Sequence, residues 1–118
     1  MTSPQTINTI QAYHAHLYYK DETGLAMAKV IALHAAQLFS IDIGRFHQRP
    51  VGPHPLWSCQ LSFTTESFAD VIPWLMLNRQ MLDVFVHPVT GDDYIDHTQG
   101  ASWLGNSHAL DISQFTPI

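Results

Sequence analysis

The chain has 118 residues, of which 46% are hydrophobic and 13% charged, and its formal net charge is −5. These values predict one folded domain spanning residues 1–118 and argue against extensive disorder. The acidic balance disfavours nucleic-acid binding, which requires a basic surface against the phosphates. No apolar run approaches the length that crosses a bilayer, and the first residues lack the features of a secretory signal. We therefore expect a cytoplasmic protein without membrane contact.

The numbers of cysteines and histidines limit the chemistry that the chain can perform. Cys59 is the only cysteine, so an intramolecular disulfide and a thiolate cluster for zinc are both excluded, and any bound metal would be held by nitrogen and oxygen. Histidines number eight, against five Lys and Arg together. Because neutral imidazole is the commonest metal ligand and suits proton transfer near neutral pH, the positions of these histidines matter most.

The first half of the chain predicts strand, helix and strand. Ala12–Tyr19 alternates, which places His14, His16 and Tyr18 on one side of a strand. Apolar residues at helical spacing then predict a helix that begins after Asp21 or Thr23 and ends near residue 40. A second strand is predicted over residues 41–47.

The second half predicts strand, helix, strand and a long tail. Three prolines predict a stiff irregular loop over residues 49–55. Alternation then predicts strands over residues 56–63 and 81–89, separated by a helix over residues 66–79 that Pro73 either divides or kinks. The segment after Thr90 is rich in Gly, Asp, Ser and Asn, and we expect it to wrap around the domain.

This order of elements is the ferredoxin-like β-α-β-β-α-β pattern, an α+β fold in which two helices cover one face of an antiparallel sheet, here with a C-terminal extension. In this topology the first strand lies between the third and the fourth. If the apolar side of each strand faces the helices, the other face is open, and it carries His14, His16, Tyr18, Ser58, Gln60, Ser62, Asp83, Phe85 and His87. The antiparallel pairing also brings His87 toward His14.

Several histidines therefore converge on one region. His14 and His16 lie about 6.6 Å apart along the strand. Both side chains can therefore bind one ion, or one can bind a metal while the other contacts a substrate. His54 lies in a Gly-Pro-His-Pro loop whose flanking residues would aim its side chain, and His97 follows Asp96, a candidate to orient it. A half-exposed histidine bound to the backbone is the simpler interpretation of each one alone. Together they favour a metal or acid–base site.

The aromatic and cationic residues are less specific. Five aromatic residues are most simply core residues, because aromatic side chains dominate buried area in small domains: Tyr13, Tyr19, Trp57, Phe63 and Trp74. Tyr18, Phe85 and Trp103 are candidates either for an aromatic pocket or for core and dimer packing. Arg45 and Arg49 could hold a substrate carboxylate through bidentate hydrogen bonds, or form surface ion pairs. Cys59 is expected to be a buried, unreactive thiol.

Five segments, in order, resemble the DOPA 4,5-dioxygenase family: Tyr13-His14-Ala15-His16-Leu17-Tyr18-Tyr19, Gly52-Pro53-His54-Pro55, Val86-His87-Pro88, Asp96-His97-Thr98 and Ala101-Ser102-Trp103-Leu104-Gly105. The resemblance covers nearly the whole chain. It implies a ferredoxin-like fold, a homodimer, and extradiol cleavage of a DOPA-like or related catechol by O₂ at a non-haem Fe(II). Such an ion suits nitrogen and oxygen ligands with open positions for catechol and O₂.

By match of motif, the resemblance implies His16, His54 and His87 as metal ligands, with His14 and His97 left as catalytic residues for proton transfer or substrate contact. Tyr18, Arg45, Arg49 and Trp103 are the predicted substrate-binding residues. Iron sites of this kind commonly include a carboxylate, yet none lies inside the strongest motifs. Asp83, Asp93 and Asp96 are candidates, and a three-histidine site or a ligand from a second subunit is the alternative.

Two other functions fit the same residues. One is a non-enzymatic dimer of ferredoxin-like fold that binds a small aromatic ligand and uses the histidines for recognition or pH response. The other is a cofactor-free monooxygenase of similar fold, whose activity would survive chelation of metals.

Overall fold

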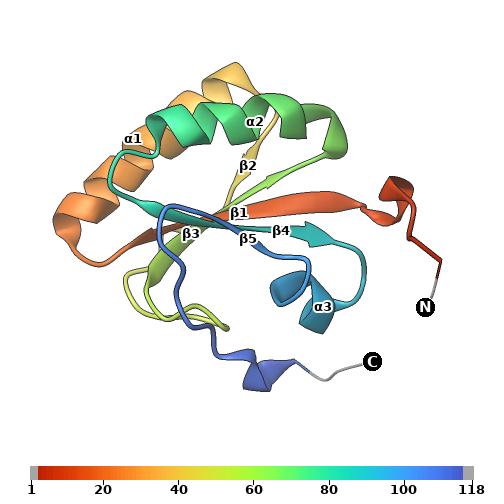
Figure 1. The fold of residues 1–118 in the computed structure, drawn as a ribbon. Helices are drawn as coiled ribbons and strands as arrows, with labels where there is room; N and C mark the ends of the chain where they lie inside the picture. The colour runs from red at the N-terminus through yellow and green to blue at the C-terminus, as the bar shows by residue number, and fades with distance from the viewer. Residues whose placement is uncertain (1–2, 116–118) are drawn as a thin grey trace.

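The structure is a computed structural model that describes residues 3–115, and it consists of one antiparallel sheet with its two long helices on one face (Figure 1). The strands are β1 (Ala12–Tyr19), β2 (Asp42–Ile43), β3 (Trp57–Phe63), β4 (Asp83–Val89) and β5 (Ser102–Leu104), in the order β2-β3-β1-β4-β5. The helices α1 (Glu22–Leu38) and α2 (Thr65–Asn78) cover one face, and α3 (Asp93–His97) lies on the opposite side (Figure 1). Two 3₁₀ turns, Ile7–Thr9 and Ile112–Gln114, lie near the ends.

The predicted ferredoxin-like α+β architecture is confirmed. β1 pairs with β3 on one side and with β4 on the other, and the register places His14 opposite both Ser62 and His87. β5 extends the sheet beyond β4, where it pairs Phe85 with Trp103. The central strand β1 therefore carries its histidines into the middle of the sheet.

The core lies between the sheet and the two long helices, as the alternation predicts. α1 begins at the N-cap Asp21, whose carboxylate accepts a hydrogen bond from the Gly24 N–H at 2.8 Å. The sheet contributes buried apolar side chains from the predicted helix-facing side of each strand: Ala15, Leu17, Tyr19, Cys59, Leu61, Phe63, Val84 and Val86. Tyr13, Trp57 and Trp74 pack against this core, so the aromatic prediction is confirmed. Burial raises the pKa of the Cys59 thiol to about 12, which makes it a poor nucleophile.

The predicted second strand over residues 41–47 is wrong in length, because only Asp42–Ile43 is regular. The following chain still runs beside β3: the Gly44 N–H donates to the Gln60 carbonyl, and the His47 N–H donates to the Ser58 carbonyl. Between these two hydrogen bonds the chain advances three residues from Gly44 to His47, whereas β3 advances only two from Ser58 to Gln60. The extra residue makes this segment bulge and interrupts the ladder.

The prediction of an open sheet face is also wrong. The side chains on that face are mostly buried, including His16, Tyr18, Ser58, Phe85 and His87. The C-terminal segment wraps around the domain as expected: β5 joins the edge of the sheet, whereas α3 and the chain after β5 cover this face (Figure 1). The candidate site therefore lies in an interior between the sheet and this cover.

Gly105 allows the turn after β5 to approach the start of β4. Its φ is +89°, and a Cβ at this position would meet the Asp83 carboxylate and lie 2.6 Å from Nη1 of Arg79. We expect Gly105→Ala to lower the free energy of unfolding by about 1–3 kcal/mol more than Gly91→Ala does. Gly91 is the matched control, because its φ is also positive, +100°, but a Cβ there would meet nothing within 4 Å. Urea unfolding of both variants measures the difference, and equal losses would contradict the crowding.

Within residues 3–115, none of the helices combines the length and apolar character that crossing a membrane requires.

Candidate metal centre

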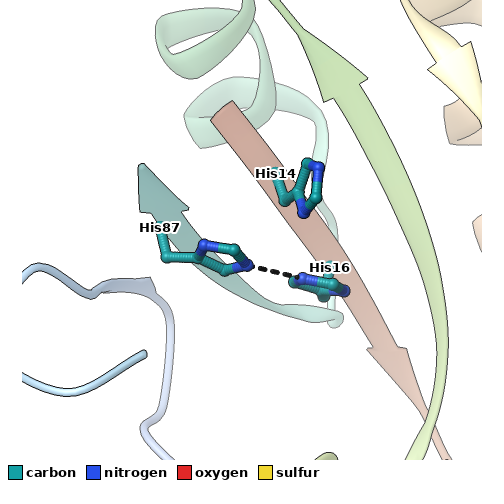
Figure 2. A group of neighbouring side chains, drawn as sticks. All are labelled: His14, His16 and His87. Carbon is teal, nitrogen blue, oxygen red and sulfur yellow. Dashed lines mark hydrogen bonds between the residues drawn. The ribbon is translucent and has the colours of Figure 1, made fainter. Parts of the chain in front are cut away.

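Three histidines from the two central strands form a cluster (Figure 2). His14 and His16 project from the same side of β1, and His87 projects from β4 toward them. One nitrogen from each ring lies within 4.8 Å of the other two. These three are the only histidine, cysteine or acidic side chains of residues 3–115 that meet this criterion as a group. Their geometry arises from the two-residue period of β1 and the His14–His87 register.

The closest contact in the cluster joins Nε2 of His16 and Nε2 of His87, which are 3.1 Å apart. Nδ1 of His87 lies 2.8 Å from the Pro88 carbonyl, which can only accept, so Nδ1 carries the proton and Nε2 presents a lone pair. His16 then donates from Nε2 in the metal-free protein. A shift of that proton to Nδ1 would direct both lone pairs into the space between the rings.

The separation of this pair fits two ligands of one ion. Metal–imidazole bonds of about 2.1 Å at angles between octahedral and tetrahedral place neighbouring nitrogens roughly 3.0–3.4 Å apart. The observed 3.1 Å lies in that range. The donor set of the cluster consists of nitrogen, which suits iron and other transition metals better than calcium or magnesium.

Burial keeps these imidazoles neutral. It lowers the pKa of His87 to about 3 and holds the pKa of His16 well below its usual value, and the neighbouring histidines add to both shifts. The pKa of His14, which is half-buried, is lowered by burial and by nearby His97. Neutral rings retain the lone pairs that a metal requires, so the electrostatics of the cluster agree with its geometry.

His54 lies at the edge of the cluster. Its ring centroid is 4.2 Å from that of His16, and its Nδ1 is 2.7 Å from the Tyr18 hydroxyl. Burial lowers the pKa of His54 to about 4. The loop that carries His54 thus places it beside the cluster, although its nitrogens are not within the 4.8 Å group. Its assignment as a ligand stays a prediction.

His97 approaches the cluster from α3. Its ring centroid is 4.0 Å from that of His87 and 4.5 Å from that of Phe115. Nδ1 of His97 lies 2.7 Å from the Asp93 carbonyl, which leaves Nε2 with a lone pair. Asp96, the residue considered for orienting His97, instead accepts hydrogen bonds from the Thr90 N–H and hydroxyl at 2.8 and 2.7 Å.

The candidate carboxylates are engaged elsewhere or exposed. Asp96 is occupied by Thr90, as described, and Asp93 is exposed. Asp83 accepts hydrogen bonds from the Asn106 N–H and from Nε2 of His108, each at 2.8 Å. Sequence reasoning missed His108, since it lies in an irregular segment without a motif. Its contacts with Asp83, Tyr18 and Trp103 reveal it.

We expect Asp96→Ala to lower the free energy of unfolding by about 2–4 kcal/mol. Asp96 is 2% exposed, and its removal leaves both the N–H and the hydroxyl of the partly buried Thr90 without their partner. Asp93→Ala is the matched control, because it removes an exposed carboxylate from the same helix. Urea unfolding measures both, and a loss for Asp96→Ala no larger than the control would contradict this account.

The predicted substrate-binding residues are divided between two regions. Trp103 packs on Phe85 and Tyr18, with ring centroids 4.7 and 5.5 Å away, so these aromatic residues form one wall beside the histidines. Arg45 and Arg49 are exposed in the segment between β2 and β3, and within residues 3–115 neither forms an ion pair. The substrate-binding role of all these residues stays a prediction.

The fold and the site together define a ferredoxin-like α+β protein with a buried histidine cluster suited to a transition metal. The sequence matches the Dopa 4,5-dioxygenase family over residues 13–114, and the chain belongs to that family. The resemblance found in the sequence motifs is thereby confirmed.

Individual relatives agree with this assignment. The chain is 34% identical to an uncharacterized 21.2 kDa protein from Botryotinia fuckeliana and 29% identical to a DOPA 4,5-dioxygenase from Amanita muscaria, and each match covers 95% of this chain. It spans 67% of the first relative and 54% of the second. A crystal structure of a provisionally assigned dioxygenase from Nostoc punctiforme PCC 73102 is 36% identical, with a TM-score of 0.78, and the match covers 92% of this chain and 94% of that one.

Proposed function

We propose that this protein is an extradiol ring-cleaving dioxygenase that opens a DOPA-like or related catechol with O₂ at a non-haem Fe(II). The observation that carries the proposal is the buried pair of His16 and His87, whose facing nitrogens are 3.1 Å apart. Membership of the Dopa 4,5-dioxygenase family supports the reaction class. The name of the Amanita muscaria relative supports the substrate class.

We propose that His16 and His87 hold the ion together with a third imidazole. His14 is favoured by the 4.8 Å grouping, and His54, the ligand implied by the sequence motifs, is favoured by its contact with His16. When bound, Fe(II) supplies positions at which catechol and O₂ can be brought together. The carbonyl of Pro88 orients His87, which is the usual role of a backbone acceptor beside a metal-binding imidazole.

The remaining residues have roles that follow from their contacts. Nε2 of His97 presents a lone pair beside His87, so we assign it the acceptance of a catechol proton and its return as the ring opens. Tyr18, Phe85 and Trp103 supply an aromatic wall against which the catechol ring can pack and from which water is excluded.

The direct experiment incubates the iron-loaded protein with L-DOPA, caffeic acid and related catechols under oxygen. We expect consumption of O₂ and the appearance of a yellow ring-opened semialdehyde, both abolished by chelation. The absence of iron binding and of turnover across a broad panel would refute the proposal. Binding of a catechol without oxygen uptake would instead support the non-enzymatic aromatic-binding function, and turnover that survives chelation would support a cofactor-free monooxygenase.

We further propose that residues 1–118 act as one domain in a cytoplasmic homodimer. The length of the chain supports a single domain, the family resemblance supports the homodimer, and the lack of secretory-signal features in the first residues supports the location. Analytical ultracentrifugation tests the oligomeric state, and a monomer at micromolar concentration would contradict it.

A further inference from the structure

His54 is held beside the histidine cluster by a hydroxyl group, whereas two other imidazoles of this region are held by carbonyls. Nδ1 of His87 and Nδ1 of His97 face the carbonyls of their neighbours at 2.8 and 2.7 Å, so both rings keep a lone pair on Nε2. Nδ1 of His54 instead lies 2.7 Å from the Tyr18 hydroxyl, which can donate as well as accept. The direction of this hydrogen bond therefore decides which nitrogen of His54 carries the proton.

The surroundings of the pair favour donation by Tyr18. The Tyr18 side chain is 2% exposed, and among residues 3–115 its hydroxyl has no hydrogen-bond partner besides His54. If His54 donated, the hydroxyl hydrogen of Tyr18 would stay buried without an acceptor, which is unfavourable. Burial lowers the pKa of His54 to about 4, so the ring is neutral near pH 7 and carries a single N–H. Tyr18 therefore donates to Nδ1, and the N–H of His54 is on Nε2.

This N–H is free to bind another group. Nε2 of His54 has no hydrogen-bond partner within the described part of the chain, whereas every fully buried side-chain nitrogen or oxygen there has one, so Nε2 borders accessible space. The His54 ring packs on His16, with centroids 4.2 Å apart, yet the group of nitrogens within 4.8 Å is completed by His14. An N–H beside the centre is suited to donate to an oxygen atom, and it offers no lone pair to a metal.

The Tyr18 ring is itself fixed by its neighbours. Trp103 and His108 pack against it, with centroids 5.5 and 5.6 Å away, and Asp83 holds His108 through a 2.8 Å hydrogen bond. The hydroxyl therefore has little freedom to turn away from His54. Such support is what a site needs when it must hold one orientation of an imidazole.

We propose that Tyr18 is a positioning residue that fixes His54 as a hydrogen-bond donor to a substrate oxygen atom, and that His54 is not a metal ligand. The inference rests on the proposed dioxygenase function, and it favours His14 as the third imidazole of the metal centre. It departs from the sequence motifs, which imply His54 as a ligand.

Histidine NMR of the metal-free protein tests the pair without turnover. Spectra of isotope-labelled protein at pH 7.5 distinguish a protonated ring nitrogen from an unprotonated one, and His54→Gln identifies the His54 signals by their loss. We expect the proton on Nε2 in the wild type, and we expect the Nδ1 signal to shift in Tyr18→Phe, where Nδ1 no longer accepts a hydrogen bond. A proton on Nδ1 in the wild type, or an unshifted Nδ1 signal in Tyr18→Phe, overturns the proposal.

Tyr19→Phe is the matched control for this experiment. It removes a buried hydroxyl from the same strand, but one that donates to the carbonyls of His47 and Ser58 and contacts no histidine ring. The His54 signals should therefore stay in place in Tyr19→Phe. A shift as large as that in Tyr18→Phe would show that loss of any hydroxyl from β1 disturbs His54, and would overturn the positioning role.

Two substitutions of His54 separate a donor from a ligand. A glutamine amide can donate a hydrogen bond, whereas leucine cannot. We expect His54→Gln and His54→Leu both to retain iron, and we expect kcat/KM to fall at least about tenfold in His54→Leu but much less in His54→Gln. Loss of iron in His54→Gln, or equal loss of activity in the two variants, overturns the proposal.

Combining variants tests whether Tyr18 acts through His54. Tyr18→Phe should lower kcat/KM about tenfold in the otherwise unchanged protein and cause no further loss in His54→Leu, because residues that act through one contact are not additive. Equal losses in both backgrounds overturn the positioning role. If the wild-type protein binds no iron and cleaves no catechol, the proposed function fails, whereas the NMR result still decides whether Tyr18 holds His54 as a donor.

Discussion

Replacing His16 or His87 with alanine should abolish the iron binding that we propose for this cluster. Each side chain is less than 5% exposed, and each supplies one nitrogen of the 3.1 Å pair. Residues that merely orient a metal ligand contribute about 10- to 100-fold in affinity or activity, so loss of a ligand should lower iron affinity and kcat/KM by at least about 100-fold. Plasma mass spectrometry of purified variants measures the iron, and an oxygen electrode measures the activity.

His34→Ala is the matched control, because His34 is exposed on α1, away from the sheet face that carries the cluster. It should retain iron and activity. The same measurement on His14→Ala and His54→Ala identifies the third ligand, since only its loss should reduce iron as strongly as the loss of His16. Full iron occupancy in His16→Ala would contradict the proposed centre.

The metal-free protein should lose stability as the pH falls from 6.5 towards 4. Burial lowers the pKa of His54 to about 4 and of His87 to about 3, against 6.5 for a free histidine. Below pH 6.5 the unfolded chain therefore binds protons that the folded chain excludes until the lower values are reached. Above pH 6.5 these imidazoles do not lower the free energy of unfolding. Below that pH, each of them lowers it by about 1.4 kcal/mol per pH unit.

Urea unfolding of chelator-treated protein at pH 7.5, 6.5, 5.5 and 5.0 measures this dependence. His87→Phe should flatten the slope between pH 6.5 and 5, because one buried imidazole no longer resists protonation. His34→Ala should leave the slope unchanged, since His34 is exposed. A free energy of unfolding that is constant over this range would show that the histidines are accessible to protons in the folded state.

The fold follows from local pattern to a large extent. Alternation in β1, β3 and β4 assigns each side chain to one face of the sheet, and the order of strands and helices then limits the topology. The pairing of β1 with β4, and hence the approach of His87 to His14, follows from the same reasoning. The family resemblance also depends on short motifs that can be identified without coordinates.

The composition of the site depends on contacts that have no sequence period. The cover over the sheet comes from residues 90–115, which are rich in turn-forming residues and acquire α3 and β5 through contact with β4. The bond between Asp83 and His108 joins residues 25 positions apart, and the Tyr18 hydroxyl engages His54 from a loop 36 positions away. Strand alternation assigns a side chain to a face of the sheet, but the direction in which its nitrogen or oxygen points depends on such neighbours. The histidines could therefore be assigned to one region from the chain alone, whereas the grouping of their nitrogens required the packed structure.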